Sequence, residues 1–531
     1  MSLGSVIAEW ASFRFSLLRA FASARLSSPW ATLGVSFGVA VCVFGLSLDF
    51  FILDPRHIDW LLATGADSSI YFFSFAFYRH APWAFPIAHF DTLFHPVGTS
   101  LILMDGLPLV AVPLKLLDRV LPLRFQFLGL WLLLCIWLQT FFAHRFLRVL
   151  KLPPLWCWVG AIIAATAPPF IGRFGHVALS SHFILIVAMT AICSELPGVV
   201  LWLAPIVALW IHPYLFAIVL ALSLTGQVRF AKARGALLRL ALTGLGLLGS
   251  MWVLGYFRLK QTRGIRFEYY ASDLSSLANS MGGGRLLPSR DLGGGTWEGQ
   301  AYLGCGGLVL CAVLIAAWIV PSFRRKSGQN WWLLGACAAM ALYSLSTAPH
   351  FLGTVLFRLE RLAQLIEPIS SRFRSSGRFI WPLYYYLLFF GLKALYRLSQ
   401  ERRWLRFAAP ALLALQLFDI WPGLLDKAAH LELNLTAKVR EVPEEIRSQL
   451  SPSTRLLIFM PPVKTACADK HWRGPYQHLA WFALLHGLST NANLGEGRAS
   501  PENNEAVCDY TLDMYRHRRD HPEAIFVRDR K

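Results

Sequence analysis

Charged residues are scarce in this sequence of 531 residues, and their scarcity excludes an ordinary soluble protein. Only 15% of the residues are Asp, Glu, Lys or Arg, whereas soluble domains average about 25%. Hydrophobic residues make up 55%, and the mean hydropathy is +0.48. Apolar runs recur along the chain at about 20 residues, the length that a helix needs to cross a bilayer. These features predict an α-helical polytopic membrane protein.

Several signatures of soluble enzymes and of metal sites are also missing. The nine cysteines form no CxxC pair, and no HExxH zinc motif occurs. No glycine-rich phosphate loop follows a strand, because the glycine runs at Gly282 and Gly293 fall in an expected loop. The net charge of +19 comes from basic residues at the ends of apolar runs, where they orient helices and meet anionic lipid. We therefore expect membrane lipids, and no nucleic acid, as partners.

The basic residues predict a topology of about 11 transmembrane helices with an N-in, C-out orientation. Residues 1–28 carry three arginines and no lysine, which predicts a cytoplasmic basic segment. Residues 100–117 contain Pro108, Pro113 and Asp105, so we expect an interfacial or re-entrant helix there. The expected spans are residues 30–53, 125–146, 155–171, 178–194, 198–211, 214–227, 237–256, 301–320, 331–347, 379–396 and 405–423.

Three parts of the chain follow from this topology. After the basic segment, a transmembrane domain is expected over residues 29–424, with extracytoplasmic loops at 54–124, 258–300 and 347–378. Residues 425–531 are polar enough to form a small extracytoplasmic α/β domain.

The sequence of the C-terminal domain predicts both strands and helices. STRLLIFMPP and EAIFVRDR predict strands, whereas GPYQHLAWFALLHGL and the residues after Pro501 predict helices. Cys467 and Cys508 both lie in this polar part, and they can pair if the domain faces an oxidising compartment. Asn434, Leu435 and Thr436 form a glycosylation sequon by pattern.

The first outer loop concentrates carboxylates among aromatic residues and prolines. Asp59, Asp67 and Asp105 are the candidates for chemistry, because carboxylates held at a bilayer interface cost solvation energy. Asp67 opens the run SSIYFFSFAFYR, whose apolar face would let a helix lie along a membrane surface.

Further polar residues fall at the expected outer ends of helices, which predicts a cavity opening to that side. Arg173 can alternatively reach lipid phosphate, and Glu298 can cap the helix expected from Ala301. The histidines can be packing residues, and SSRFRSSGR at 370–378 can grip a phosphate or line up with lipid headgroups. The candidate binding residues are Arg173, His176, His212, Glu298, Arg372, Arg374 and Arg378.

The order of these features resembles the GT-C class of membrane glycosyltransferases, which take sugars from polyprenyl-phosphate carriers. An acidic residue in the first outer loop precedes the proline-flanked GLPLVAVPLKLL, and a later helix ends outside in GRFGH. HPVGTSLILMDGLPL, GHVALSSHFIL, EGQAYLG and FRSSGRFIWP also resemble a group of bacterial polytopic membrane proteins with no assigned activity.

The resemblance implies roles for individual residues. Asp67 matches the first-loop acid that serves as base or metal ligand, with Asp59 and Asp105 as further candidates. GRFGH holds Arg173 and His176 where many members carry a second acid. This departure argues against a two-carboxylate metal site and leaves a divalent metal ion as an optional cofactor.

The implied reaction transfers a sugar from a polyprenyl-phosphate-linked donor to a glycan, lipid or protein acceptor outside the cytoplasm. A carboxylate would take the acceptor proton, and arginines would stabilise the leaving phosphate. The implied location is the bacterial inner membrane, with a cytoplasmic N-terminus and a periplasmic C-terminus. The same residues would also suit a flippase of lipid-linked sugar, and a non-catalytic membrane scaffold is a third alternative.

Overall fold

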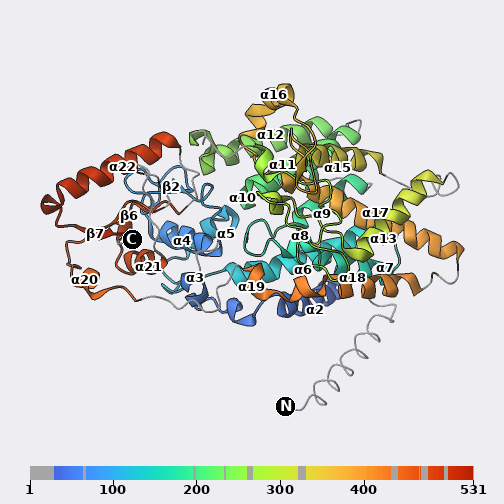
Figure 1. The fold of residues 1–531 in the computed structure, drawn as a ribbon, viewed down its shortest axis with the longest axis horizontal. Coiled ribbons are helices and arrows are strands. Elements are labelled where there is room, and N and C mark those ends of the chain that lie inside the picture. The colour runs from blue at the N-terminus through green and yellow to red at the C-terminus, as the bar shows by residue number, and fades with distance from the viewer. Residues whose placement is uncertain are drawn as a thin grey trace, which may run out of the picture.

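The computed structural model describes residues 29–63, 67–194, 199–231, 235–259, 267–320, 330–402, 405, 407–431, 441–463, 465, 467, 476–494 and 500–529. It is mostly helical and elongated, and its C-terminal elements lie at one end of the long axis (Figure 1). The basic segment at 1–28 and the sequon at Asn434 lie outside the described residues.

Apolar helices form the body of the molecule and indicate an integral membrane protein. Five are long enough to cross a bilayer: α2 (Pro29–Ser47), α6 (Leu128–Val149), α12 (Ala236–Leu254), η6 with α17 (Ser376–Glu401) and α18 (Ala408–Leu425). The shorter ones are α7 (Pro154–Ala165), α9 (Phe183–Cys193), α10 (Val200–Ile211), α11 (Pro213–Arg229), α13 (Gly304–Ile319) and α15 (Trp331–Ser344).

The predicted α-helical membrane fold is thus confirmed, and every expected span coincides with one of these helices. The number of crossings stays a prediction, because several of the helices are shorter than a bilayer is thick.

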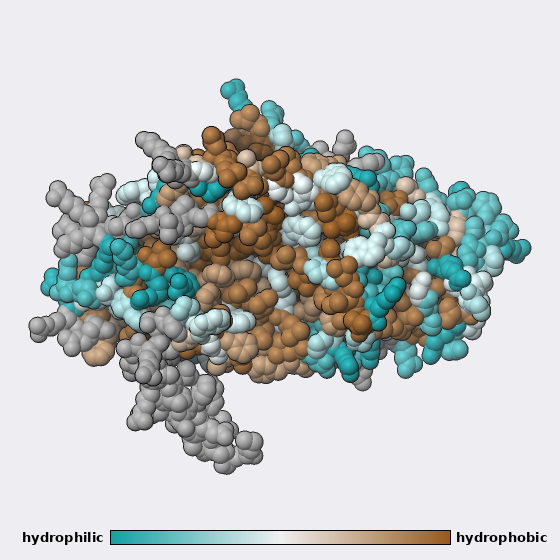
Figure 2. Space-filling view, turned by 180° about the vertical axis from the view of Figure 1, so that it is seen from behind, coloured by the Kyte–Doolittle hydropathy of each residue, from teal (hydrophilic) through white to brown (hydrophobic). Residues whose placement is uncertain are grey.

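Burial separates the central helix from the peripheral ones. α17 is buried along almost its whole length, including the three consecutive tyrosines at 384–386. α12 instead exposes most of its leucines, and the hydrophobic surface extends over much of the body (Figure 2). Exposing an apolar surface of this extent to water would be unfavourable, so lipid is the expected neighbour of this surface.

The chain between α2 and α6, which is the expected first outer loop, folds into short elements. They are η2 (Phe50–Leu53), α3 (Asp59–Ala63), α4 (Asp67–His80), β1 (His89–Phe90), β2 (Thr99–Ser100) and α5 (Pro108–Leu116). α5 has nine residues, which is too short to cross the hydrocarbon core. This length agrees with the expectation that residues 100–117 do not span the membrane.

The expectation that α4 lies along a membrane surface is wrong. Every residue from Ser68 to Arg79 is buried, and Phe72 contacts Trp481 of the C-terminal helix α21 (Gln477–Leu485) with ring centroids 6.0 Å apart. Neighbouring protein elements, α3, α5 and the C-terminal helix α21, pack against α4, so protein rather than lipid headgroups encloses this helix.

Two carboxylates hold the later loops, which are expected on the same side as the first. Asp273 accepts hydrogen bonds from the backbone of Ser275, Leu352 and Gly353. Asp419 of α18 accepts from the Tyr302 hydroxyl and from Cys305 N. The second contact caps the start of α13, so the alternative that Glu298 caps this helix is wrong.

The remaining elements are short. They are α8 (Pro168–Ile171), η3 (Tyr256–Arg258), η4 (Phe267–Tyr270), η5 (Thr296–Gly299), η6 (Ser376–Ile380), β3 (His350–Phe351), β4 (Thr354–Val355), α16 (Glu360–Ser370), α19 (Lys427–His430), α20 (Glu444–Arg447) and η8 (Arg518–Asp520).

The C-terminal part is a small α/β unit, as predicted. β5 (Leu456–Met460) pairs in parallel with β6 (Ser489–Thr490) and with β7 (Ala524–Arg528), in the order β6-β5-β7. The helices are α21 and α22 (Pro501–Arg516). β5, α21, α22 and β7 are the four elements expected from the sequence, and parallel strands separated by helices suit a buried, Leu- and Ile-rich central strand.

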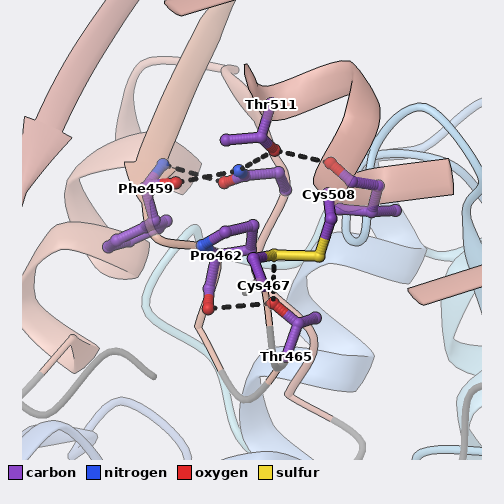
Figure 3. Close-up of a disulfide and its surroundings, with 8 residues drawn as sticks. Phe459, Pro462, Thr465, Cys467, Cys508 and Thr511 are labelled. Atoms are coloured by element: carbon purple, nitrogen blue, oxygen red, sulfur yellow. Dashed lines mark hydrogen bonds between the residues drawn. A yellow bond between two sulfur atoms is a disulfide. The ribbon is translucent and has the colours of Figure 1, made fainter. Parts of the chain in front are cut away.

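Cys467 and Cys508 form a disulfide, which confirms the predicted pair (Figure 3). Their Cα atoms are 5.5 Å apart, within the usual range. Asn491 strengthens the same region: its side chain pairs with the backbone of Phe459 in β5 and donates to Thr511 in α22. The disulfide therefore joins α22 to a loop that follows β5.

The loop between α2 and α6 docks on the edge of this sheet. Leu93 forms a parallel bridge with Thr490 of β6, and His95 N donates to Thr490 O at 3.0 Å. Phe94 N also donates to Ala492 O at 3.1 Å. The loop therefore covers the β6 edge and fixes the C-terminal unit against α4.

Candidate functional site

A buried ionic cluster joins three loops at the end of the bundle that carries the C-terminal unit. Glu298 of η5 accepts a hydrogen bond from Arg173 Nη1 at 2.8 Å and another from Arg378 Nε at 2.8 Å. All three side chains are at most 5% exposed. Arg173 also donates to the backbone oxygens of Trp297 and Glu298. We call these three residues the arginine–glutamate bridge.

Glycines bring the two halves of the bridge together. Gly299 follows Glu298 and Gly377 precedes Arg378. A Cβ atom on Gly377 would lie 2.6 Å from Gly299 Cα, so η5 and η6 can touch only where neither carries a side chain. Ser272 Oγ donates to the carbonyls of both glycines, at 3.4 and 3.2 Å. The close backbone contact between Gly299 and Gly377 thus positions the neighbouring side chains of Glu298 and Arg378 for their ion pair.

The bridge is charged and carries a net positive charge. Burial alone would raise the pKa of Glu298, but the charges of Arg378 and Arg173 outweigh it and hold that pKa well below its ordinary value. Burial lowers the pKa of Arg173, and the charge of Glu298 opposes that effect. Two guanidinium groups therefore share one carboxylate, which is the arrangement that makes a buried charge tolerable.

Asp67 and His176 form a His–carboxylate pair beside the bridge, which we call the open pair. His176 Nε2 lies 2.7 Å from Asp67 Oδ2, and the side chains are 12% and 24% exposed. The His176 ring packs against Trp297, with centroids 5.8 Å apart. Among the described residues, none hydrogen-bonds to His176 Nδ1. GRFGH thus supplies Arg173 to the bridge and His176 to Asp67.

Asp105 and His212 form a second pair, which we call the closed pair. His212 Nε2 lies 3.2 Å from Asp105 Oδ1. His212 Nδ1 accepts from Tyr214 N at 3.1 Å and so caps the start of α11. Because Nδ1 accepts, the ring proton belongs on Nε2, which donates to Asp105. Asp105 itself adopts a φ of +51°, in the region that costs energy for a residue with a Cβ.

Tyr214 connects the closed pair to the bridge. The Arg378 guanidinium lies over the Tyr214 ring, 4.5 Å from its centroid. The Tyr214 hydroxyl accepts from Ser375 N at 2.9 Å. One pair therefore contacts the Arg173 side of the bridge and the other contacts the Arg378 side.

The sequence profile of one family matches residues 37–421, which include both pairs and the bridge. The chain belongs to the family described as a domain of unknown function (DUF6311). The matched DUF6311 region contains the apolar helices that follow α2 and ends within α18, before the C-terminal α/β unit. No curated protein matches the chain.

Seven of the residues singled out from the sequence meet in this part of the DUF6311 region. They are Asp67, Asp105, Arg173, His176, His212, Glu298 and Arg378. The alternative that Arg173 reaches lipid phosphate is wrong, because its guanidinium is buried against Glu298. Tyr214 and Trp297 were missed, although each lies within two residues of a chosen position.

Three other chosen residues lie apart from the cluster. Asp59 pairs with Arg124 at 2.8 Å, and both side chains are 55% exposed. Arg372 is exposed, whereas Arg374 is partly buried with its guanidinium 5.8 Å from the Tyr270 ring centroid.

A buried polar chain inside the DUF6311 bundle was also missed. His182 Nδ1 lies 2.9 Å from the Tyr385 hydroxyl, which accepts from Gln139 Nε2 at 2.8 Å. The His182 ring lies against Trp381, which in turn contacts Arg173. The phrase GHVALSSHFIL contained the signal, because His182 lies within an apolar run.

Metal ligands are not grouped in the described part of the chain. No three His, Cys, Asp or Glu side chains there are close enough to hold a metal ion. The carboxylates of the cluster are instead paired with histidine or arginine. The cluster therefore combines titratable histidines with buried guanidinium groups.

Proposed function

We propose that this protein is a membrane glycosyltransferase that moves a sugar from a polyprenyl-phosphate carrier to an extracytoplasmic glycan, lipid or protein. The observation that carries the proposal is the open pair, a partly exposed Asp67 and His176 beside a cationic bridge. The DUF6311 match supplies no activity, so the proposal rests on this geometry and on the GT-C-like order of the loops.

The open pair would accept the proton that the acceptor hydroxyl loses during transfer. The acceptor oxygen bonds to the anomeric carbon as the sugar–phosphate bond breaks, and the phosphate leaves with the bonding electrons. The acceptor proton passes to the open pair, in which Asp67 orients and supports His176. His176 Nδ1 is the ring atom that can accept this proton while Nε2 donates to the Asp67 carboxylate.

The bridge would stabilise the negative charge on the leaving phosphate. Arg173 and Arg378 outnumber Glu298, so the bridge presents a net positive charge next to the open pair. Fixed donors of this kind stabilise negative charge that grows in a transition state. Arg372 is exposed at the same loop and would bind the donor phosphate before reaction, so Arg372→Ala should weaken donor binding.

We place the protein in a bacterial inner membrane with its N-terminus in the cytoplasm and its C-terminus in the periplasm. The disulfide between Cys467 and Cys508 supports this orientation, because disulfides persist in oxidising compartments. Reporter fusions after Leu121 and at Lys531 should both report the outer side. A cytoplasmic signal at Lys531 would overturn the orientation and the site assignment.

The decisive experiment is a lipid extract and surface-glycan profile of a strain that lacks the gene. Loss of one sugar, with build-up of its lipid-linked donor on the outer leaflet, supports the transferase. Build-up on the inner leaflet would favour a flippase, and an unchanged profile would favour a scaffold. Complementation with Asp67→Asn then separates a missing reaction from a missing protein.

A further inference from the structure

Helix α16 leaves most of an apolar face exposed. Leu362, Leu365, Ile366 and Ile369 follow the i, i+3, i+4, i+7 spacing of one helical face. Leu365 is 77% exposed and Ile369 is 57% exposed. Leu356 and Phe357, which lead into the helix, are also exposed. An exposed apolar stretch of this size in an ordered protein marks an interaction surface.

The position of α16 shows what covers that face. The helices α2, α6 and α12 run roughly along the long axis, with the C-terminal unit at one end, and α16 stands out from the flank beyond α12 (Figure 1). From behind, the same projection carries hydrophobic atoms that continue into the hydrophobic surface of the bundle (Figure 2). The flank of a bundle that crosses a membrane along its long axis faces lipid.

The opposite face of α16 is polar. Arg361, Gln364 and Glu367 are all exposed, and Arg358 just before the helix pairs with Glu268. A short helix with one apolar and one charged face lies in a membrane interface, with its apolar side among acyl chains. The apolar face continues into the hydrophobic surface of the bundle, and this continuity favours lipid over a second protein.

We propose that α16 is a lipid-binding helix whose apolar face is embedded among the hydrocarbon chains of the membrane leaflet on the side of the C-terminal unit. Arg372 and Arg374 follow directly, where basic residues meet lipid phosphates. Lipid held by α16 then lies along the loop that leads to Arg378. The proposal concerns the membrane contact alone and does not depend on the sugar-transfer reaction.

Photo-crosslinking of the full-length protein in phospholipid nanodiscs tests the proposal. The photoreactive residue p-benzoylphenylalanine is placed at Leu365 or Ile369 on the apolar face, and at Gln364 as the matched position on the polar face. Leu245 of α12, which is 69% exposed, calibrates labelling by lipid. All four positions are exposed, so the substitutions should leave the fold intact.

Severalfold more lipid adduct at positions 365 and 369 than at 364, approaching the yield at 245, is the expected result. Equal yields at 364 and 365, with normal labelling at 245, would overturn the proposal. Adducts from 365 to protein instead of lipid would also overturn it and would identify a protein partner. None of these outcomes is affected by whether the protein transfers sugar.

Discussion

The open pair and the closed pair have the same chemistry but different surroundings. In the closed pair, both ring nitrogens of His212 are engaged, one by Asp105 and one by the backbone of Tyr214. In the open pair, only Nε2 of His176 is engaged among the described residues. A histidine with both nitrogens held can fix a structure, but it must break a contact before it accepts a proton.

The difference arises from where each histidine lies in the chain. His212 precedes Pro213 and stands at the N-terminus of α11, where unpaired backbone N–H groups need acceptors. His176 lies in a loop with no helix to cap. An Asp–His contact alone therefore does not identify a catalytic pair, because the partner of the second ring nitrogen decides whether the ring can accept a proton.

Removing the Glu298 carboxylate, which holds the two arginines of the bridge together, should have the largest effect. Glu298→Gln leaves two buried guanidinium groups with a neutral partner, which should lower the free energy of unfolding by about 3–5 kcal/mol. Thermal unfolding of the purified protein measures this loss. Glu268→Gln, at the more exposed ion pair with Arg358, is the control and should cost less than about 1 kcal/mol. Equal losses would show that the bridge does not hold the site together.

Asp67→Asn tests the catalytic assignment of the open pair. It should reduce sugar transfer by roughly a hundredfold or more, the scale of general acid–base catalysis, with little change in the melting temperature. Asp105→Asn is the matched change in the closed pair and should reduce transfer less. Wild-type transfer with Asp67→Asn, but none with Asp105→Asn or Asp59→Asn, would show that another carboxylate is the base.

Two substitutions of His212 test the structural assignment of the closed pair. His212→Ala removes the cap of α11 and should cost about 1 kcal/mol of stability, whereas His212→Asn keeps a side-chain acceptor and should cost less. His176→Ala removes no cap and should destabilise less than His212→Ala. The melting temperatures of the three variants test this order of stability. A larger loss of stability for His176→Ala than for His212→Ala would contradict the structural role assigned to His212.

The smallest effect is expected at Asp59, the candidate carboxylate outside both pairs. Asp59→Asn breaks an exposed contact with Arg124, so stability should change by less than about 1 kcal/mol. Transfer should stay at the wild-type level. Loss of transfer without loss of stability would move the catalytic site away from the open pair.

Local sequence pattern was sufficient to predict the apolar helices, the main elements of the C-terminal unit and the disulfide between Cys467 and Cys508. Long apolar runs predicted the helices, because a bilayer leaves the backbone few other ways to satisfy its hydrogen bonds. Alternating and apolar segments predicted β5, α21, α22 and β7. Cys467 and Cys508 were the plausible disulfide because they are the two cysteines in the polar C-terminal part, while the others lie in or near apolar runs.

Tertiary structure decided which polar residues meet. Arg173 and Glu298 are separated by 125 positions, and Glu298 and Arg378 by 80. Nothing periodic in the sequence indicates that η5 and η6 touch through Gly299 and Gly377. The sequence identified seven residues of the cluster as a set, but their pairing depends on packing between distant loops.

The sequence by itself determined a helical membrane protein with a polar α/β end, because hydrophobic length and periodicity are local properties. It could not determine that α4 is buried, since the unit that covers it lies about 400 residues further along the chain. Nor could it show that His176 pairs with Asp67 and His212 with Asp105. Each aspartate lies far from its histidine in the chain, so these pairs depend on how distant loops pack.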